Sequence, residues 1–343
     1  MKNYRGGKKL PKNYIDLLNK VGDGYSKISL RKLANMVMGN RIGILILIIV
    51  VIYLIGINFS EYLLTIDNFL VMLMGFSNYV FISIGMTMVI IAGGFDLSVG
   101  SILALSAVIT GMVVGKSRMS YALAILVGLL VGASVGALNG TLINRFKINP
   151  LITTLGMMYL VRGIALIVTR GYPIVGIPIE FQKLGQGTIA GIQIPIIVMI
   201  ILVVIFSILV AKARFFRQLY FVGDNEQAAH LTGMNVSSLR FFTYVMVGLF
   251  SGLAGVFHVA RLGSAQPTAG GGTELWVIAS VIIGGGRMGG GRGTVLGTFL
   301  ALFFMGLINN TLNMLGVSIY LQQAVIGLLL LGAIIIEPKR QRE

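Results

Sequence analysis

The chain has 343 residues, of which 56% are hydrophobic and only 11% are charged, and its formal net charge is +16 at pH 7. Soluble domains carry about a quarter of their residues as charged ones, so the composition predicts an all-α polytopic membrane protein in a lipid bilayer. The lack of cysteine and the presence of only two histidines exclude thiol chemistry, and we expect no bound metal or cofactor.

The basic residues indicate an orientation in the membrane rather than a nucleic-acid surface. They gather in the N-terminal arm (1–41), in the loops and in the tail (337–343), without interleaved aromatic residues. Cytoplasmic segments of membrane proteins are rich in Lys and Arg. We therefore predict a basic cytoplasmic arm, a transmembrane domain over 42–336 and a cytoplasmic tail. Nucleic acid is excluded as a partner.

Apolar runs of about 20 residues are long enough to cross a hydrocarbon core of about 30 Å. With the N-terminus inside, most loop Lys and Arg residues fall on the cytoplasmic side, which places both termini in the cytoplasm. The run at 273–286 is short, and we expect it to be tilted or re-entrant. About ten spans are predicted, at 42–59, 69–92, 99–115, 121–143, 151–169, 193–211, 242–260, 273–286, 294–312 and 319–336.

Two pairs of segments resemble each other and indicate an internal repeat. "GGFDLSVGSILALSAVITG" (93–111) resembles "GGTELWVIASVIIGG" (271–285), with Asp96 over Glu274. "VGALNGTLIN" (135–144) resembles "MGLINNTLN" (305–313), with Asn139 near Asn309. The members of each pair start on opposite sides of the predicted membrane. This pattern predicts two inverted five-helix repeats, a plan common in transporters.

Two glycine motifs resemble nucleotide sites but lack the required context. "GMVVGKS" (111–117) is one residue short of a phosphate-binding loop and lies at the end of a predicted membrane helix. "GGGRMGG" (284–290) contains the spacing of a dinucleotide site but lies in no βαβ unit. The chain therefore shows no site that converts energy, and we expect an ion gradient or a partner to drive any transport.

One polar insert, "GDNEQAAHLTGMNVSSLR" (223–240), lies between two strongly apolar runs. We predict that Asp224 caps a short helix, with Gln227 reaching back as in a capping box. Gly233 would end this helix, and Asn235 would cap the next one. So short a helix is marginal alone in water, so it either lies on its own protein as a linker or docks a cytosolic partner.

The insert and three other motifs resemble a known family. "GGFDLSVGSILAL", "ARLGSAQPTAGGGTELWVIASVIIGG" and "LINNTLNMLGVSIY" occur in the order and spacing of ABC importer permeases of the ribose, xylose and galactose type. The resemblance covers residues 65–336. It implies a permease subunit in a bacterial cell membrane, not an enzyme, that forms the path for a ribose-like monosaccharide. The N-terminal arm is longer than the family pattern predicts.

The same resemblance implies partners and a cytoplasmic coupling loop at 212–241. The partners are a cytosolic ATP-binding-cassette ATPase, an extracytoplasmic sugar-binding protein and a second permease subunit, either another copy or a paralogue. The insert would be the handle that the ATPase moves. Residues that match the coupling loop, with one smooth apolar neighbour, are Gly223, Asp224, Asn225, Glu226, Ala228, Ala229, Leu231 and Gly233.

Polar residues within the spans are candidates for the translocation path. We expect Asp96 or Ser98 to cap a helix start, and Glu274 to do the same. Arg162 is expected to pair with a carboxylate or with carbonyl groups. Asparagine amides suit a sugar, although bonds between helices are their commoner use. The candidates are Asn78, Asp96, Ser98, Asn139, Arg162, Gln266, Glu274, Asn309 and Asn310.

Several alternatives stay open at this point. Nucleoside or branched-chain amino acid ABC permeases share the architecture. An ion-coupled secondary transporter would need carboxylates near the membrane centre, whereas Asp96 and Glu274 lie at predicted helix starts. A channel would need a ring or a filter motif, and a membrane enzyme would need a catalytic constellation. Neither is present in the sequence.

Overall fold

The computed structural model describes residues 41–56, 61–116 and 120–335, and this part of the chain is almost entirely helical. The predicted arm before residue 41 and the predicted tail fall outside it. Six described helices are long and apolar enough to cross a membrane, and four shorter apolar helices accompany them. Together these ten helices coincide with the ten predicted spans.

The helices follow one another with short connections, and a two-stranded antiparallel hairpin (β1–β2) precedes α8. In chain order the elements are α2 (Arg41–Gly56), η1 (Glu61–Leu64), α3 (Ile66–Ile91), α4 (Val99–Lys116), α5 (Tyr121–Asn144), α6 (Pro150–Thr169), α7 (Ile179–Gln186), β1 (Thr188–Ile189), β2 (Ile192–Gln193), α8 (Ile194–Lys212), α9 (Arg214–Asp224), α10 (Glu226–Leu231), α11 (Val236–Leu262), α12 (Thr273–Ile283), α13 (Val295–Met314) and α14 (Ile319–Ile335).

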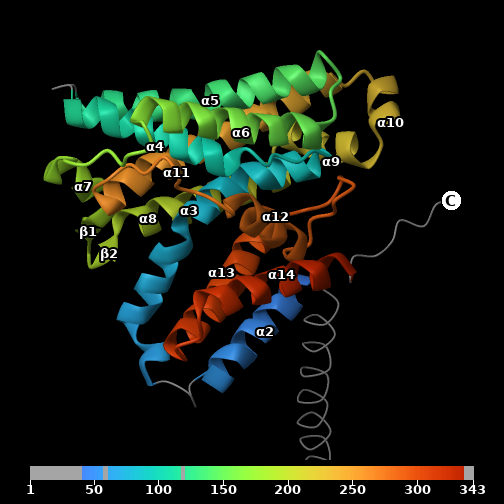
Figure 1. Ribbon diagram of the computed structural model, residues 1–343. Coiled ribbons are helices and arrows are strands. Elements are labelled where there is room, and N and C mark those ends of the chain that lie inside the picture. Colours follow the sequence, from blue (N-terminus) through green and yellow to red (C-terminus); the bar gives the residue numbers. More distant parts are fainter. Residues whose placement is uncertain (1–40, 57–60, 117–119, 336–343) are drawn as a thin grey trace, which may run out of the picture.

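The helices pack in two groups with the same internal arrangement. In the first group α4 packs against α5 and α6, and α11 packs against α4 and α5. In the second group α12 packs against α13 and α14, and α3 packs against α12 and α13. Figure 1 shows α4, α5, α6 and α11 lying together, with α12, α13 and α14 beside α2 in the other part of the molecule. The helices α3 and α11 contact each other and join the two groups.

A seam of glycines brings α5 and α11 into backbone contact. Gly128, Gly132 and Gly136 recur every four residues and so lie on one face of α5. A Cβ at Gly132 would overlap the carbonyl oxygen of Gly248 on α11, and a Cβ at Gly252 would lie 2.7 Å from the carbonyl oxygen of Gly128. Small residues at a helix interface in a membrane permit such close packing.

The two segments predicted to be repeat partners touch each other. Each follows a long helix and leads into the next one without helical structure, at residues 92–98 and 263–272. Gly270 has φ +71° and packs directly on Gly100 at the start of α4. A Cβ at Gly100 would overlap the carbonyl oxygen of Gly270. Only glycine fits at this crossing, because neither backbone leaves room for a side chain.

The glycine seam generates a prediction about stability. We expect Gly132→Ala to lower the free energy of unfolding by about 1–3 kcal/mol, because the added methyl group meets backbone that cannot move aside. The control Gly156→Ala lies on the exposed side of α6 with no atom within 4 Å, and it should be neutral or stabilising by about 0.5–1 kcal/mol. Thermal unfolding in detergent measures both, and equal midpoints for the two variants would contradict the seam.

Candidate functional site

The polar insert forms α10 and the end of α9, and its first cap differs from the prediction. Asp224 is the last residue of α9, and the side chain of Asn225 accepts a hydrogen bond from the Ala228 N–H at 3.0 Å. The predicted capping box of Asp224 and Gln227 is therefore wrong. The Asp224 carboxylate instead lies 2.6 Å from the Arg287 guanidinium, which is a stronger partner than the amides of a short helix.

The end of α10 follows the predicted pattern. Gly233 has φ +81° and its N–H donates to the His230 carbonyl at 3.0 Å, while the Met234 N–H donates to the Ala229 carbonyl at 3.2 Å. This pair of bonds satisfies carbonyls at the end of the helix. Asn235 then caps α11 by accepting from the Ser238 N–H at 3.0 Å.

One side of α10 packs on the protein and the other is open. Ala229 is buried, whereas Ala228 and Leu231 are exposed, and the Leu231 side chain is 90% exposed. The apolar side chain of Leu231 therefore lies on the side of α10 that faces away from the rest of the described protein. In Figure 1 this helix stands at one end of the molecule, far from α7 and the hairpin.

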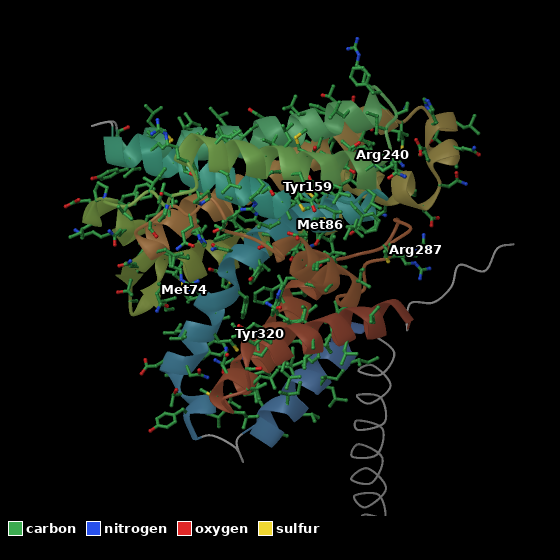
Figure 2. All side chains as sticks on the ribbon, viewed as in Figure 1. Met74, Met86, Tyr159, Arg240, Arg287 and Tyr320 are labelled. Atoms are coloured by element: carbon green, nitrogen blue, oxygen red, sulfur yellow. The ribbon has the colours of Figure 1, made fainter. Side chains whose placement is uncertain are left out.

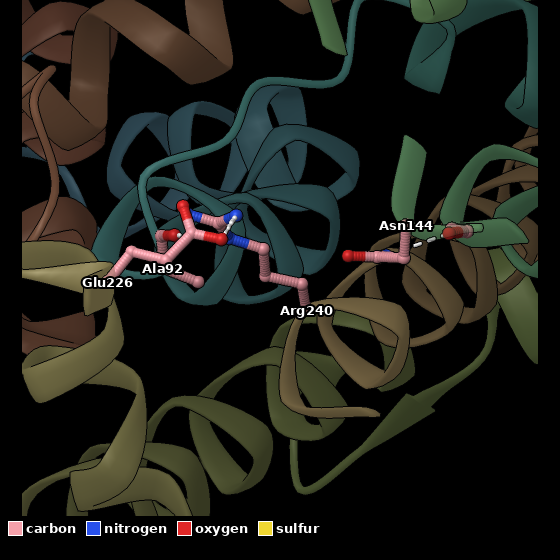
Figure 3. Close-up of polar contacts among 5 residues, drawn as sticks. Ala92, Asn144, Glu226 and Arg240 are labelled. Atoms are coloured by element: carbon pink, nitrogen blue, oxygen red, sulfur yellow. Dashed lines mark hydrogen bonds and ion pairs between the residues drawn. The ribbon is translucent and has the colours of Figure 1, made fainter. Parts of the chain in front are cut away.

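The first residue of α10 is joined to two membrane helices. Glu226 Oε1 lies 2.9 Å from Arg240 Nη1 near the start of α11. Arg240 Nε also donates to the Ala92 carbonyl, at 3.4 Å, directly after α3 (Figure 3). The single guanidinium group of Arg240 therefore contacts both α10 and the segment that follows α3.

A second ion pair joins the end of α9 to the glycine-rich loop 284–294. Arg287, which pairs with Asp224, also donates from Nε to the Gly290 carbonyl at 2.8 Å. The Gly291 N–H donates to the Ile91 carbonyl at 2.8 Å. Figure 2 shows Arg240 and Arg287 at the same end of the molecule as α10 in Figure 1. The loop that resembles a dinucleotide motif therefore packs against α9 and the end of α3.

The end of α9 leaves no room for a side chain on this side. A Cβ at Gly223 would overlap the carbonyl oxygen of Ile91. One turn earlier, the Tyr220 hydroxyl donates to the Gly293 carbonyl at 2.9 Å. Burial raises the pKa of Tyr220 above its ordinary value, because the charged phenolate loses solvation, so this hydroxyl keeps its proton and its bond.

A cavity of about 330 Å³ opens beside the Glu226–Arg240 pair. It lies between α10 and the turn that joins α5 to α6, and both charged and amide side chains line it. Figure 3 draws Asn144, which is one of the lining residues, together with Glu226 and Arg240. The polar lining includes Asn144, Lys147, Asn149, Glu226, Arg240 and Tyr244.

Among the path candidates, three residues form one buried cluster. Asp96 is fully buried, and the Ser98 N–H and hydroxyl both donate to its Oδ1. Asn139 on α5 donates to Asp96 Oδ2 at 3.2 Å and to Ser98 Oγ at 2.9 Å. The expectation that Asp96 satisfies an amide at a helix start is confirmed, because Ser98 directly precedes α4.

Glu274 and Arg162 have different surroundings. Glu274 lies in the first turn of α12, whose N-cap is Gly272 without a side-chain cap bond, so the expectation that Glu274 caps this helix is wrong. The glycine's φ of +79° turns the chain into the helix instead. Arg162 donates to the carbonyls of Pro267 and Ala269 at 2.7 and 2.6 Å, as expected for a pair with carbonyl groups.

The other path candidates do not converge on one point. Gln266 is exposed. The remaining amides bond to other side chains: Asn78 to His258 Nδ1 at 3.4 Å, Asn309 to Gln322 at 2.9 Å, and Asn310 to Asn68 at 2.9 Å. These bonds join neighbouring helices, which is the commoner use of amides in a membrane.

Sequence reasoning missed the partners of the coupling loop. Arg240 and Arg287 were interpreted only as inside-positive residues, although two acids and two bases gather in the predicted cytoplasmic loops. It also missed a planar stack of Tyr79 on α3 and Trp276 on α12, whose ring centroids are 5.3 Å apart at 7°. No local pattern predicts that stack, since it depends on how α3 and α12 pack.

Residues 65–334 match the protein family described as a branched-chain amino acid transport system permease component. The chain belongs to this family of transport permeases, and it is a multi-pass protein of a bacterial cell membrane.

Relatives are individually named after sugars. The ribose import permease protein RbsC of Bacillus subtilis (strain 168) is 45% identical over 76% of this chain and 81% of its own length. RbsC of Escherichia coli (strain K12) is 36% identical over 81% and 87%. The D-allose transport system permease protein AlsC of the same strain is 34% identical over 87% and 91%. No solved structure matches the chain.

The observed cap of α10 predicts a local effect of mutation. Asn225→Ala should destabilise α10 by about 1 kcal/mol and so speed amide exchange in residues 226–231 about fivefold. The capping-box hypothesis predicts that Gln227→Ala also speeds amide exchange in these residues. In the observed structure Gln227 is not part of the cap, so this variant should leave the exchange rate unchanged. Hydrogen exchange read by mass spectrometry compares them, and a faster rate in the Gln227 variant alone would restore the capping box.

The buried cluster around Asp96 predicts a larger, global effect. Asn139→Leu removes the amide that donates to Asp96 Oδ2, and leaving a buried acceptor unpaired costs about 1–3 kcal/mol. Gln227→Leu removes an exposed amide on α10, where water can replace it. Thermal unfolding in detergent should show a clearly lower midpoint for the first variant only; an unchanged midpoint would mean that Asp96 finds another donor.

Proposed function

We propose that this chain is the membrane-spanning permease subunit of an ATP-binding-cassette importer for a monosaccharide, with a ribose-like sugar as the substrate. The names of its relatives, ribose import permeases at 36–45% identity, support the substrate class. The observation that carries the coupling role is α10, a helix capped at both ends, anchored by the Glu226–Arg240 ion pair and exposed on its outer side.

We propose ten membrane spans in two inverted five-helix repeats, with both termini in the cytoplasm. The packing of α3 and α11 supports the repeat, because each of them packs on the helices that follow the other, and the matching helix pairs contact each other in both groups. The excess of Lys and Arg on the α10 side supports the orientation. On this plan the transmembrane domain covers 42–336 and the coupling loop 212–241.

The partners follow from what the chain itself can supply. The sequence has no phosphate-binding loop in a suitable context, so a separate cytosolic ATPase would hydrolyse ATP and move α10. A sugar-binding protein outside the membrane would deliver the substrate. A second permease subunit, another copy or a paralogue, would complete the path. The path candidates named above stay proposals, and we expect no cofactor.

A branched-chain amino acid permease is a second candidate function, favoured by the description of the family. The three named relatives instead carry sugar names. An ion-coupled mechanism has less support, because Asp96 is engaged by Ser98 and Asn139 at a helix start.

Co-purification from the native cell tests the proposal. Tagged protein extracted in mild detergent should retain an ABC ATPase. Leu231→Asp should lower the amount of co-purifying ATPase at least about tenfold, as expected when a charge enters an apolar contact. Tyr172→Asp is the matched control, because Tyr172 is 74% exposed after α6, away from α10. Retention of the ATPase by both variants would remove α10 from the interface, and its absence from the wild-type preparation would overturn the importer.

A further inference from the structure

Arg240 lies where three separate segments meet. It is the fifth residue of α11, it pairs with Glu226 of α10, and its Nε contacts the carbonyl of Ala92. Its side chain is 24% exposed, whereas that of Glu226 is 49% exposed. So exposed a pair adds little to stability, because water screens both charges. A contribution to stability therefore does not explain why Arg240 lies at this junction.

The segment that begins at Ala92 is held along its length by two helices. Four residues after Arg240, on the same face of α11, the Tyr244 hydroxyl donates to the Phe95 carbonyl at 3.2 Å. The next residue, Asp96, is bonded by Asn139 of α5. The segment 92–98 is thus fixed by α11 and α5, and a displacement of its first residue is passed on to its end.

The end of this segment reaches the crossing of the two halves. Ser98 leads into α4, and Gly100 in the first turn of α4 packs directly on Gly270. Gly270 belongs to the segment before α12, whose neighbour Ala269 is held by Arg162 of α6. A continuous chain of contacts therefore runs from α10 through Arg240 to the start of α4 and to the segment before α12.

We propose that Arg240 is a positioning residue that transmits the movement of α10 to the segment 92–98 and so to the start of α4. Arginine suits this role because its planar guanidinium presents several donors in a fixed fork, so one side chain binds a carboxylate and a carbonyl together. The proposal rests on the proposed function, in which an ATPase moves α10. It adds the residue through which that movement enters the membrane helices.

The test uses the intact complex of this chain with its co-purifying ATPase and binding protein, reconstituted in vesicles. The variants are Arg240→Gln, Glu226→Gln and the two combined. The control is Arg145→Gln, which removes the same charge from an exposed position directly after α5, outside the coupling loop. Retained ATPase, ATP hydrolysis, uptake of labelled ribose and the thermal midpoint are measured for each.

We expect Arg240→Gln to keep its ATPase and its thermal midpoint while ribose taken up per ATP falls about 2- to 30-fold, the range for residues that couple distant sites. The double variant should lose no more than Arg240→Gln alone, because both residues act through one contact. Arg145→Gln should transport normally.

Three results would overturn the role of Arg240. One is wild-type uptake per ATP in Arg240→Gln, and another is full additivity of the two single variants. The third is loss of the bound ATPase in Arg240→Gln, which would make Arg240 part of the docking surface. Failure of the proposed function looks different, since wild-type vesicles would then show no ATP-dependent ribose uptake at all.

Discussion

Backbone hydrogen bonding in an apolar surrounding is the constraint on which this structure depends. Hydrocarbon offers no partner to a free N–H or C=O, so a chain can leave helical structure at membrane depth only where protein surrounds it. The segments 92–98 and 263–272 leave helical structure between apolar helices, and each has its own polar supports. Asp96 accepts from the Ser98 amide, and Arg162 donates to the carbonyls of Pro267 and Ala269. Asp96 and Arg162 thus have their places because of the two breaks in the helices.

The helices could be predicted from the sequence because their signal is strong and local. Ten apolar runs predicted ten helices, and glycine and asparagine correctly marked the end of α10 and the start of α11. The prediction that Asp224 caps α10 was wrong because the Asp224 carboxylate binds Arg287 instead. Arg287 lies in a loop more than 60 residues away in the sequence. A pattern of neighbouring residues contains no information about such a partner.

The amides show the same limit for the candidate site. Asn139 is a member of the buried cluster, whereas Asn309 bonds to Gln322 on α14 and Asn310 bonds to Asn68 on α3. All lie in similar apolar sequence, so composition alone cannot separate them. The role of each amide is decided by which helix it faces. That depends on how α3 and α11 pack against each other and against the neighbouring helices. The helices were therefore predictable, while the network of hydrogen bonds between them was not.

The glycine seam between α5 and α11 has a consequence for how such a protein changes shape. Two helices whose backbones touch have no flexible side chains between them to take up a shift. Even a small slide of one helix along the other would therefore bring backbone atoms into overlap. The helices α4, α5, α6 and α11 should therefore tilt as a single solid body. Side chains rather than backbone fill much of the contact between α3 and α13, where Phe76 packs edge-on against Phe303. That contact lies within the second group, so α3 and α13 should shift against each other more readily than α5 and α11 do.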